Sequence, residues 1–520
     1  MIHWYGGHKG YFDHGSLIRA FDRAGIEDGD ISNGGILVVA GRTFANDVEG
    51  VQSLIDGMPW VLLCVVSDEE LSFSLSRLRL PDRCAVWVQT PGPDTVANRY
   101  LTCGVPEPVA RECRAGKSDP VRTWTFAGQV THPARKDMAA AVAGRQDGEI
   151  RPTEGFAQGM AAKEYAEFMA SGKCVLCPGG PVTPDTFRLH EALELGRLPI
   201  AWGSAYWDRV FPGSPFPKVD SVSEALPILD RYADDLAWLT DCNRTWAWWL
   251  REKRQLAIDI EDTVARLSGV RQERDRLTVL IPTSPTPSNG DHLWDVVESI
   301  REVHPDCEIL IMMDGVRPEH EGRRMQYELY RRRIIRACAY TWHNVLPLFF
   351  SAHTHQAAMT RHALGMVRTD AIFFVEHDTP LLATRHVDYD GILDAIRDRP
   401  DVNMVRLHYD ESIHPEHRYL MLDYSPTGTP PMIRTAQWSQ RPHIARTEFY
   451  RWMIATQFSA DALCMIEDKV HGSLQVAVQN GNWAEWGTWV YAEGWPDAMK
   501  RSGHSDARGG DSKFEHAFRW

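Results

Sequence analysis

Two carboxylates separated by one residue follow a short apolar run in the C-terminal half of the chain. In FFVEHDTPL, Phe373–Leu381, the apolar residues predict a buried strand that ends at Glu376 and Asp378. Ligands of open α/β sheets bind outside the carboxyl ends of the strands, so both side chains are expected to face a crevice. A divalent cation prefers such oxygen ligands and can neutralise a diphosphate leaving group. An acidic turn that does no chemistry is the structural alternative.

Two earlier strands are predicted to end at the same edge. The sequence LTVLIPTS is an apolar run that ends at Pro282 and Thr283, and EILIMM, Glu308–Met313, is followed directly by Asp314. Because parallel strands place their carboxyl ends together, we expect these polar residues to lie near the later pair of carboxylates.

This order of strands and polar residues resembles the nucleotide-sugar-binding half of GT-A glycosyltransferases, especially the large inverting family two. The resemblance implies that Pro282, Thr283 and Asp314 form the uridine site. It also implies that Glu376 binds the ribose and the metal, and that Asp378 ligates a divalent cation, Mn²⁺ or Mg²⁺. The family usually has Asp where this chain has Glu376.

Further residues match the same family in the expected order. Asp468, in CMIEDKVHG, corresponds to the carboxylate that takes a proton from the acceptor hydroxyl. His504 corresponds to a C-terminal metal-ligating histidine, with His471 as its competitor, and Arg361 is the candidate for contact with the diphosphate. The implied reaction is inverting transfer of a sugar from a UDP-sugar to an acceptor hydroxyl.

A glycine-rich loop between a strand and a helix is the clearest feature of the N-terminal half. In Glu164–Ile200 the strand KCVLC leads into Gly179 and Gly180, and the following helix carries Arg188 and Glu191. Loop glycines and a helix N-terminus favour a bound anion, and the carboxylate can accept from ribose hydroxyls. A glycine-rich turn of any α/β protein would look the same.

With the preceding WTFAGQVTHPAR, this stretch resembles the C-terminal lobe of exostosin-like GT-B glycosyltransferases, which join a GT-B-like module to a C-terminal GT-A module. The resemblance implies a nucleotide-sugar site, which uses no metal, at Gly128, Arg135, Gly179, Gly180, Asp185, Arg188 and Glu191. Asp68 and His14 are the candidates for a base in this half.

Strand-length apolar runs that alternate with helix-length amphipathic stretches predict an α/β fold. We expect a GT-B-like pair of Rossmann-type lobes at residues 1–118 and 119–244, a linking helix at 245–276 and a GT-A domain with a mixed, Rossmann-like sheet at 277–520. The linking helix is predicted to pack on the second lobe through its tryptophans, Trp246, Trp248 and Trp249.

Composition excludes some classes of protein. The 520 residues carry a formal charge of −14, which argues against general neutralisation of nucleic-acid phosphates. No apolar run reaches the roughly 18 residues of a membrane span, and no secretory signal precedes the first strand, so a cytoplasmic protein is expected. Cys174 and Cys177 form the only C-x-x-C pair, which is too few ligands for a zinc finger.

Together these patterns predict a bifunctional glycosyltransferase, whose N-terminal module is either a second transferase or a remnant that binds the acceptor. The acceptor is a protein, a glycan or modified DNA, and the sequence leaves the oligomeric state open. A non-catalytic carbohydrate-binding scaffold and a phage-type DNA-base glycosyltransferase are the alternatives.

Overall fold

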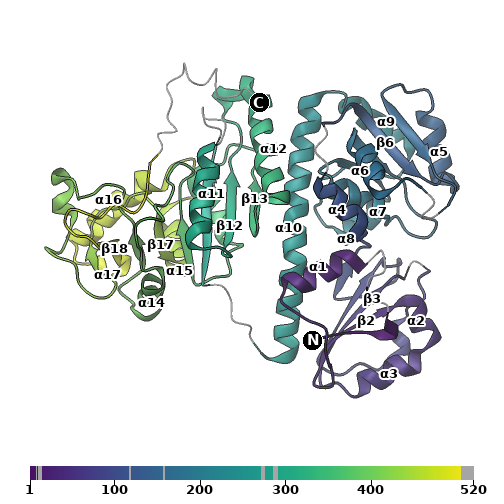
Figure 1. Cartoon of the computed structure of the whole chain (residues 1–520), viewed down its shortest axis with the longest axis horizontal. Helices are drawn as coiled ribbons and strands as arrows, with labels where there is room; N and C mark the ends of the chain where they lie inside the picture. Colours follow the sequence, from purple (N-terminus) through teal and green to yellow (C-terminus); the bar gives the residue numbers. More distant parts are fainter. Residues whose placement is uncertain are drawn as a thin grey trace. The chain divides into compact units, whose positions relative to one another are not determined.

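We describe a computed structural model of the chain, which covers residues 1–7, 9, 14–68, 70–115, 119–155, 159–270, 276–284 and 291–504. The chain divides into two compact units, Met1–Gln272 and Glu273–Trp520 (Figure 1). Each unit is described by itself.

The first unit contains two parallel five-stranded sheets. The first sheet has the order β1-β2-β3-β4-β5, with β1 (Ile2–Trp4), β2 (Gly35–Ala40), β3 (Val61–Val66), β4 (Cys84–Gln89) and β5 (Arg99–Leu101). Strands β2 and β3 are buried along their whole length, as expected for apolar strands covered on both faces. The helices of this lobe are α1 (Gly15–Arg23), α2 (Gly41–Asn46) and α3 (Val48–Asp56).

The second sheet has the order β10-β9-β8-β6-β7 and is also parallel. Its strands are β6 (Arg122–Gly128), β7 (Gly148–Pro152), β8 (Gly172–Cys177), β9 (Leu198–Trp202) and β10 (Lys218–Val219). Its helices are α4 (Glu107–Ala115), α5 (Pro133–Val142), α6 (Ala162–Ala170), α7 (Phe187–Glu194), α8 (Ser204–Val210) and α9 (Val222–Arg231).

A long helix, α10 (Asp235–Ser268), runs past both lobes of this unit (Figure 1). The side chain of Asp234 caps its first turn, and Gly269 ends it in the left-handed conformation. The helix therefore begins before the predicted boundary at residue 245 and ends before 276, and residues 271–275 lie outside the described chain.

Helix α10 packs on both lobes. Trp246 lies against Gly196, where an added Cβ would stand 2.6 Å from the indole ring, and Trp248 and Trp249 are also buried. The tryptophans are core residues of the second lobe, as predicted. At the other end Ile260 and Leu267 belong to the apolar core of the first lobe, which the sequence analysis did not anticipate.

The second unit is built on one eight-stranded mixed sheet of order β13-β12-β11-β14-β17-β15-β18-β16. Strands β11 to β14 are parallel, and β17 runs antiparallel to both of its neighbours. The strands are β11 (Leu277–Thr283), β12 (Glu308–Met313), β13 (Val345–Phe349), β14 (Ala371–Phe374), β15 (Met404–Arg406), β16 (Met432–Arg434), β17 (His443–Arg446) and β18 (Thr488–Tyr491). The predicted α/β class, with parallel sheets first and a mixed sheet last, is confirmed.

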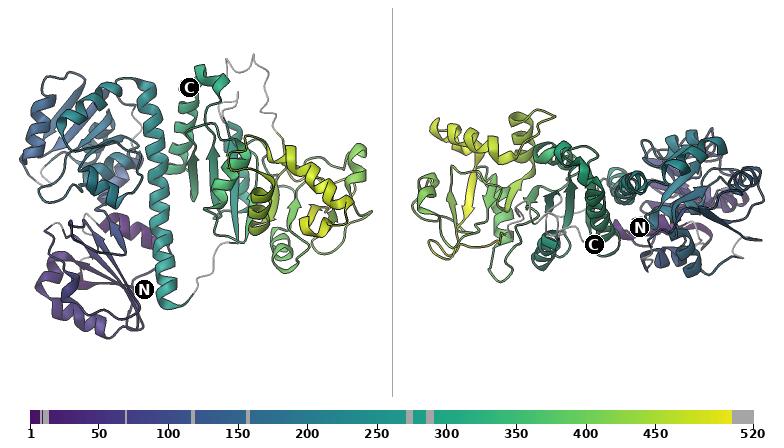
Figure 2. Two further views of the ribbon diagram at one scale, coloured as in Figure 1. Left: turned by 180° about the vertical axis from the view of Figure 1, so that it is seen from behind. Right: turned by 90° about the horizontal axis from the view of Figure 1, so that it is seen from above.

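Seven α-helices accompany this sheet among the described residues, and two further views of the ribbon show them in Figure 2. They are α11 (Asp291–Val303), α12 (Arg324–Tyr340), α13 (His355–Leu364), α14 (Tyr389–Asp398), α15 (Thr447–Gln457), α16 (Ile466–Gln479) and α17 (Trp483–Trp486). None of the helices in the described parts of the chain is long and apolar enough to cross a membrane.

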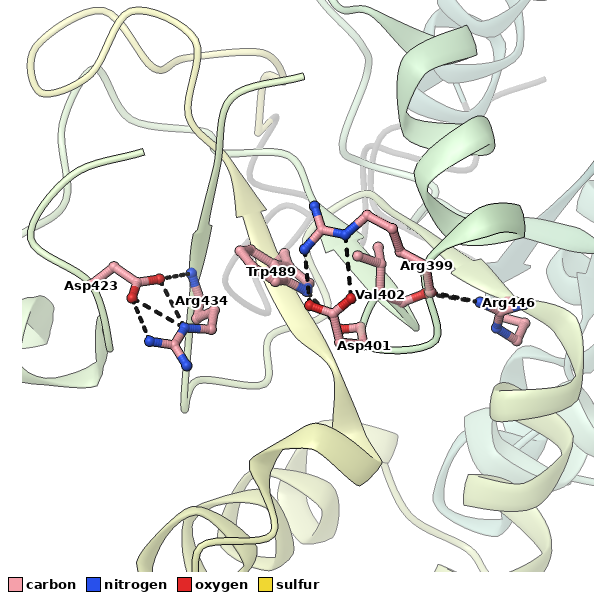
Figure 3. Close-up of polar contacts among 7 residues, drawn as sticks. All are labelled: Arg399, Asp401, Val402, Asp423, Arg434, Arg446 and Trp489. Atoms are coloured by element: carbon pink, nitrogen blue, oxygen red, sulfur yellow. Dashed lines mark hydrogen bonds and ion pairs between the residues drawn. The ribbon is translucent and has the colours of Figure 1, made fainter. Parts of the chain in front are cut away.

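Polar contacts fix the antiparallel half of this sheet (Figure 3). The Arg399 guanidinium pairs with Asp401, and the Trp489 indole donates to the Asp401 carbonyl at 2.8 Å. Arg446 donates to the Arg399 carbonyl at 3.1 Å. These bonds tie the turn before β15 to the ends of β17 and β18. On β16, Arg434 makes a forked pair with Asp423.

Candidate functional site

The carboxyl edge of the large sheet gathers the polar residues that end β11 and β14. The N–H of Val375 donates to the Leu280 carbonyl at 3.0 Å, which extends the pairing of β14 with β11 beyond its last strand residue. His377 then lies with Nδ1 3.3 Å from the Pro282 carbonyl. The turn that carries Glu376 and Asp378 is therefore adjacent to Pro282, as the strand order predicted.

Asp314 lies at the end of β12 and is buried. Its Oδ1 accepts from the N–H groups of Gly315 and Thr354, both at 2.7 Å, and its Oδ2 lies 2.9 Å from His353 Nδ1. Asp314 therefore anchors the segment before α13. Thr283, at the end of β11, contacts the Tyr330 hydroxyl at 2.5 Å. Both residues have protein partners at the positions where uridine contacts were expected.

Glu376 is a half-buried carboxylate in an acidic setting. Burial, reinforced by the charge of Asp378, raises the pKa of Glu376 to about 7, and Glu467 adds to the effect. Gln356, at the start of α13, donates to Glu376 Oε1 at 3.2 Å. Arg441 lies near enough for its charge to oppose the rise in this pKa.

Gln356 also connects this carboxylate to the start of α16. Its Oε1 accepts from the Ile466 N–H at 3.0 Å and from Gln440 Nε2 at 2.5 Å. The Gln440 N–H in turn donates to Glu467 Oε2 at 3.2 Å. Gln356 could not be predicted from the sequence, because a lone glutamine at a helix start has no diagnostic spacing.

Asp378 and His504 form the pair that best suits a metal ion. His504 Nε2 lies 3.7 Å from Asp378 Oδ2. The ligand atoms of Glu376, Asp378 and His504 do not all lie within 4.8 Å of one another. Among the described residues, a single group of three side chains, elsewhere in the chain, meets that distance. Glu376 was expected to share the metal, and its position does not support that. His471 contacts the Trp438 N–H and Gln475 instead.

Asp468 is exposed in the first turn of α16. Its neighbour Glu467 is the less exposed of the two and faces Gln440. Arg361 donates to the carbonyls of Ile454 and Phe458, at 2.9 Å and 2.7 Å. Those contacts cap the end of α15, which differs from the diphosphate contact that was expected.

A second candidate site lies in the first unit, beneath the glycine-rich loop. A cavity of about 600 Å³ is enclosed by residues from α4 to α7. Of the predicted residues, those that line it are Gly128, Arg135, Gly180, Asp185, Arg188 and Glu191. Gly179 contributes through its carbonyl, which accepts from Arg135 Nε at 3.3 Å.

Two guanidinium groups share this cavity. Arg188 donates from Nε to the Ala127 carbonyl at 2.9 Å and stacks over Phe126 at 4.4 Å, while its Nη1 has no hydrogen-bond partner among the described residues. Burial, with the charge of Arg188, lowers the pKa of Arg135 to about 10. Gly128 has φ +140°, and a Cβ there would stand 2.3 Å from Arg188 Nη2. This pair of buried cations suits a phosphate group.

The two acidic residues of the cavity differ in role. Glu191 accepts from the Tyr165 hydroxyl at 2.5 Å, and burial raises its pKa. Asp185 was predicted to bind the nucleotide. Its Oδ2 accepts from the Cys103 N–H, and its Oδ1 lies 3.3 Å from Cys103 Sγ and 3.0 Å from His190 Nε2. Asp185 therefore has protein partners at the position where a nucleotide contact was expected.

The two candidates for a base in the first lobe are buried at the end of β3. Asp68 accepts from the N–H groups of Ser72 and Phe73, at 2.7 Å and 3.1 Å, and burial raises its pKa. His14 Nε2 lies 3.1 Å from the Ser67 hydroxyl. Asp68 thus holds a loop, and neither residue lines the cavity of the second lobe.

No protein-family model matches the chain, and no curated protein matches it. Among solved structures, S. aureus TarS 1-349 is similar at 12% identity and a TM-score of 0.28, over 44% of this chain and 60% of that one. The structure of TarS 1-349 in complex with UDP-GlcNAc is similar at 11% identity and a TM-score of 0.28, over 46% of this chain and 60% of that one.

Glucosyl-3-phosphoglycerate synthase from Mycobacterium tuberculosis, in complex with phosphoglyceric acid, gives 12% identity and a TM-score of 0.26, over 44% of this chain and 72% of that one. The chain thus spans less than two thirds of the TarS chains. All of these TM-scores lie below 0.5, so the site is interpreted from its own geometry.

Proposed function

We propose that this protein is a glycosyltransferase that uses a UDP-sugar, with its metal-dependent site at the carboxyl edge of the large sheet. The observation that carries the proposal is the proximity of Asp378 and His504 beside Pro282, next to the half-buried carboxylate of Glu376. One carboxylate and one imidazole leave most of the coordination sphere of a divalent cation open. Substrate phosphates complete such spheres in phosphate-handling sites.

The residues fit a Mn²⁺ or Mg²⁺ ion held by Asp378 and His504. When bound, the cation neutralises the diphosphate as the sugar leaves. Glu376, held by Gln356, is placed to accept from donor hydroxyls rather than to ligate the metal. Arg441, whose charge reaches Glu376, is the cation that we assign to the diphosphate in place of Arg361.

Asp468 is the proposed base. It is exposed in the first turn of α16, so an acceptor hydroxyl can reach it. Attack by that hydroxyl on the anomeric carbon, from the side opposite to the leaving UDP, inverts the configuration. The acceptor is a protein, a glycan or modified DNA.

The cavity of the first unit is a second nucleotide-sugar site in this proposal, and it uses no metal. Its support is the pair of guanidinium groups, Arg135 and Arg188, beside the glycines of the loop and the carboxylate of Glu191. This module either transfers a second sugar or retains binding alone.

The test is release of UDP from a panel of UDP-sugars with Mn²⁺, with and without EDTA. We expect turnover by the wild type that EDTA abolishes and that Asp378→Ala lowers by at least about a hundredfold, the loss typical of a removed electrostatic group. Asp461→Ala, which removes an exposed carboxylate from the same unit, is the control and is expected to keep full activity.

The scaffold alternative makes the opposite prediction. If no donor is turned over, and neither UDP nor Mn²⁺ shifts the melting temperature, the assignment of Asp378 and His504 is wrong. Turnover that resists EDTA and requires Arg188 would move the activity to the first unit.

A further inference from the structure

Three buried side chains with metal-ligand atoms converge in the first unit, beside the cavity that Asp185 also lines. Cys103 lies on the segment between β5 and α4, Asp185 follows the glycine-rich loop, and His190 is on α7. Their ligand atoms all lie within 4.8 Å of one another, and the side chains of Asp185 and His190 are completely buried. Among the described residues this is the one group of three that meets this distance.

The distances within the group suit a tetrahedral ion. Asp185 Oδ1 lies 3.3 Å from Cys103 Sγ and 3.0 Å from His190 Nε2. Ordinary zinc bonds to sulfur, nitrogen and oxygen, set at tetrahedral angles, separate such pairs by about 3.5 Å and about 3.3 Å. Asp185 Oδ1 therefore lies within a few tenths of an ångström of the spacing that zinc requires from each of the other two ligand atoms.

The surroundings of the group supply a fourth position. The Tyr206 hydroxyl is buried and has no hydrogen-bond partner among the described residues. Burial and the charges of Asp185 and Cys103 raise the pKa of Tyr206 well above its ordinary range. A water molecule held by this hydroxyl would complete the coordination sphere.

The environment of His190 favours an ion at its Nε2. Its Nδ1 is buried and also has no hydrogen-bond partner among the described residues. Trp207 and Trp249 surround the ring, at centroid distances of 6.4 Å and 5.7 Å. Nε2 lies 3.0 Å from Asp185 Oδ1, so a cation between them would be held by both groups.

We propose that Cys103, Asp185 and His190 form a structural zinc site that fastens the segment after β5 to the second lobe. Cysteine sulfur, histidine nitrogen and aspartate oxygen are all ordinary zinc ligands. The N–H of Cys103 already donates to Asp185 Oδ2 at 3.0 Å, so the ion would reinforce an existing attachment. The proposal does not rest on the proposed transferase activity or on the metal at Asp378, although Asp185 also lines the cavity of the first unit.

Metal content of the purified full chain, measured by mass spectrometry, tests this site. We expect one zinc ion per chain in the wild type and in Asp378→Ala. We expect none in Cys103→Ser, because a serine hydroxyl can still donate to Asp185 but binds zinc poorly. Cobalt added after chelation should give the thiolate-to-cobalt absorption band in the wild type and not in Cys103→Ser. Cys64→Ala, a buried cysteine outside the group, should keep both the zinc and the band.

A purely hydrogen-bonded group gives a different result. The wild type would then contain no stoichiometric zinc after growth with zinc supplied, chelation would not change its melting temperature, and Cys103→Ser would melt within a few degrees of it. That outcome, or zinc that remains in Cys103→Ser, overturns the proposal whether or not the protein proves to be a transferase.

Discussion

Gln356 is the residue that couples the acidic turn after β14 to the start of α16. It donates to Glu376 and accepts from the Ile466 N–H and Gln440. Because the side chain is buried, its removal leaves two donors and one acceptor without a partner.

We expect Gln356→Ala to lower the free energy of unfolding by about 1 to 3 kcal/mol. We also expect it to reduce kcat for UDP release more than it raises KM, since the base on α16 loses its position relative to the donor. Gln479→Ala, at an exposed position at the end of α16, is the control. Equal kinetic constants in Gln356→Ala and wild type would contradict a positioning role.

Gly128 allows Arg188 to reach the cavity of the first unit. With φ +140°, and with Arg188 Nη2 2.3 Å from any added Cβ, an alanine must displace either the backbone or the guanidinium. We expect Gly128→Ala to weaken metal-independent UDP binding by about tenfold or more, equivalent to about 1.4 kcal/mol. Calorimetry in EDTA measures this, with Gly144→Ala, which meets no atom within 4 Å, as control.

Some residues of each candidate site could be predicted from the sequence, but the hydrogen bonds that connect them to other elements could not. Glu376 and Asp378 were predictable because an apolar strand ended at them, and Arg188 because it followed a glycine-rich loop. Gln356 and the partners of Asp185 were not, since a hydrogen bond between residues far apart in the chain leaves no local pattern. Arg361 was misassigned because a helix-face arginine and a helix-capping arginine look alike in sequence.

Helix α10 is the element that joins the cores of the two lobes. Ile260 is fully buried in the core of the first lobe, although it lies far along the chain from that lobe. We expect Ile260→Ala to cost about 2 to 5 kcal/mol of unfolding free energy, the usual cost of a cavity of that size. Chemical denaturation would measure it. Arg266→Ala, at an exposed position of the same helix, should change stability by less than about 0.5 kcal/mol.

The long elements were easier to predict than the short ones. Buried parallel strands such as β2, β11 and β12 are continuous apolar runs, so the sequence showed them. Strands β15 and β16 have three residues each, too few for a periodicity, and their order in the sheet depends on contacts such as that of Trp489 with Asp401. The antiparallel half of the large sheet therefore emerged only from the structure.

At the scale of the whole molecule, buried neutral histidines make stability depend on pH. Burial lowers the pKa of His304, His408 and His443 to about 4. An unfolded histidine has a pKa near 6.5, so the unfolded chain takes up protons between about pH 6.5 and 4 that the folded chain does not. The free energy of unfolding should fall as the pH is lowered through this window.

The effect of one histidine can be isolated. The Nδ1 of His443 lies 2.8 Å from the Arg441 carbonyl, and its Nε2 lies 3.0 Å from the Tyr450 hydroxyl. His443→Gln should reduce the loss of stability between pH 7 and pH 5 by about 1 to 2 kcal/mol. Glu376, whose raised pKa acts in the opposite direction, is present in both proteins and cancels in the comparison. Identical pH slopes for the two proteins would contradict the assignment.

The two proposed nucleotide sites belong to separate compact units and are expected to bind independently. Calorimetric titration with UDP and Mn²⁺ should therefore give two sites per chain, because each unit has its own phosphate-binding groups. EDTA or Asp378→Ala should remove one site, and Arg188→Ala should remove the other. If the two sites are independent, their contributions add, so the double variant should lose both sites. Each single variant should leave the affinity of the remaining site within about twofold of wild type. A single site that both variants abolish would show that the cavity of the first unit and the edge of the large sheet serve one ligand.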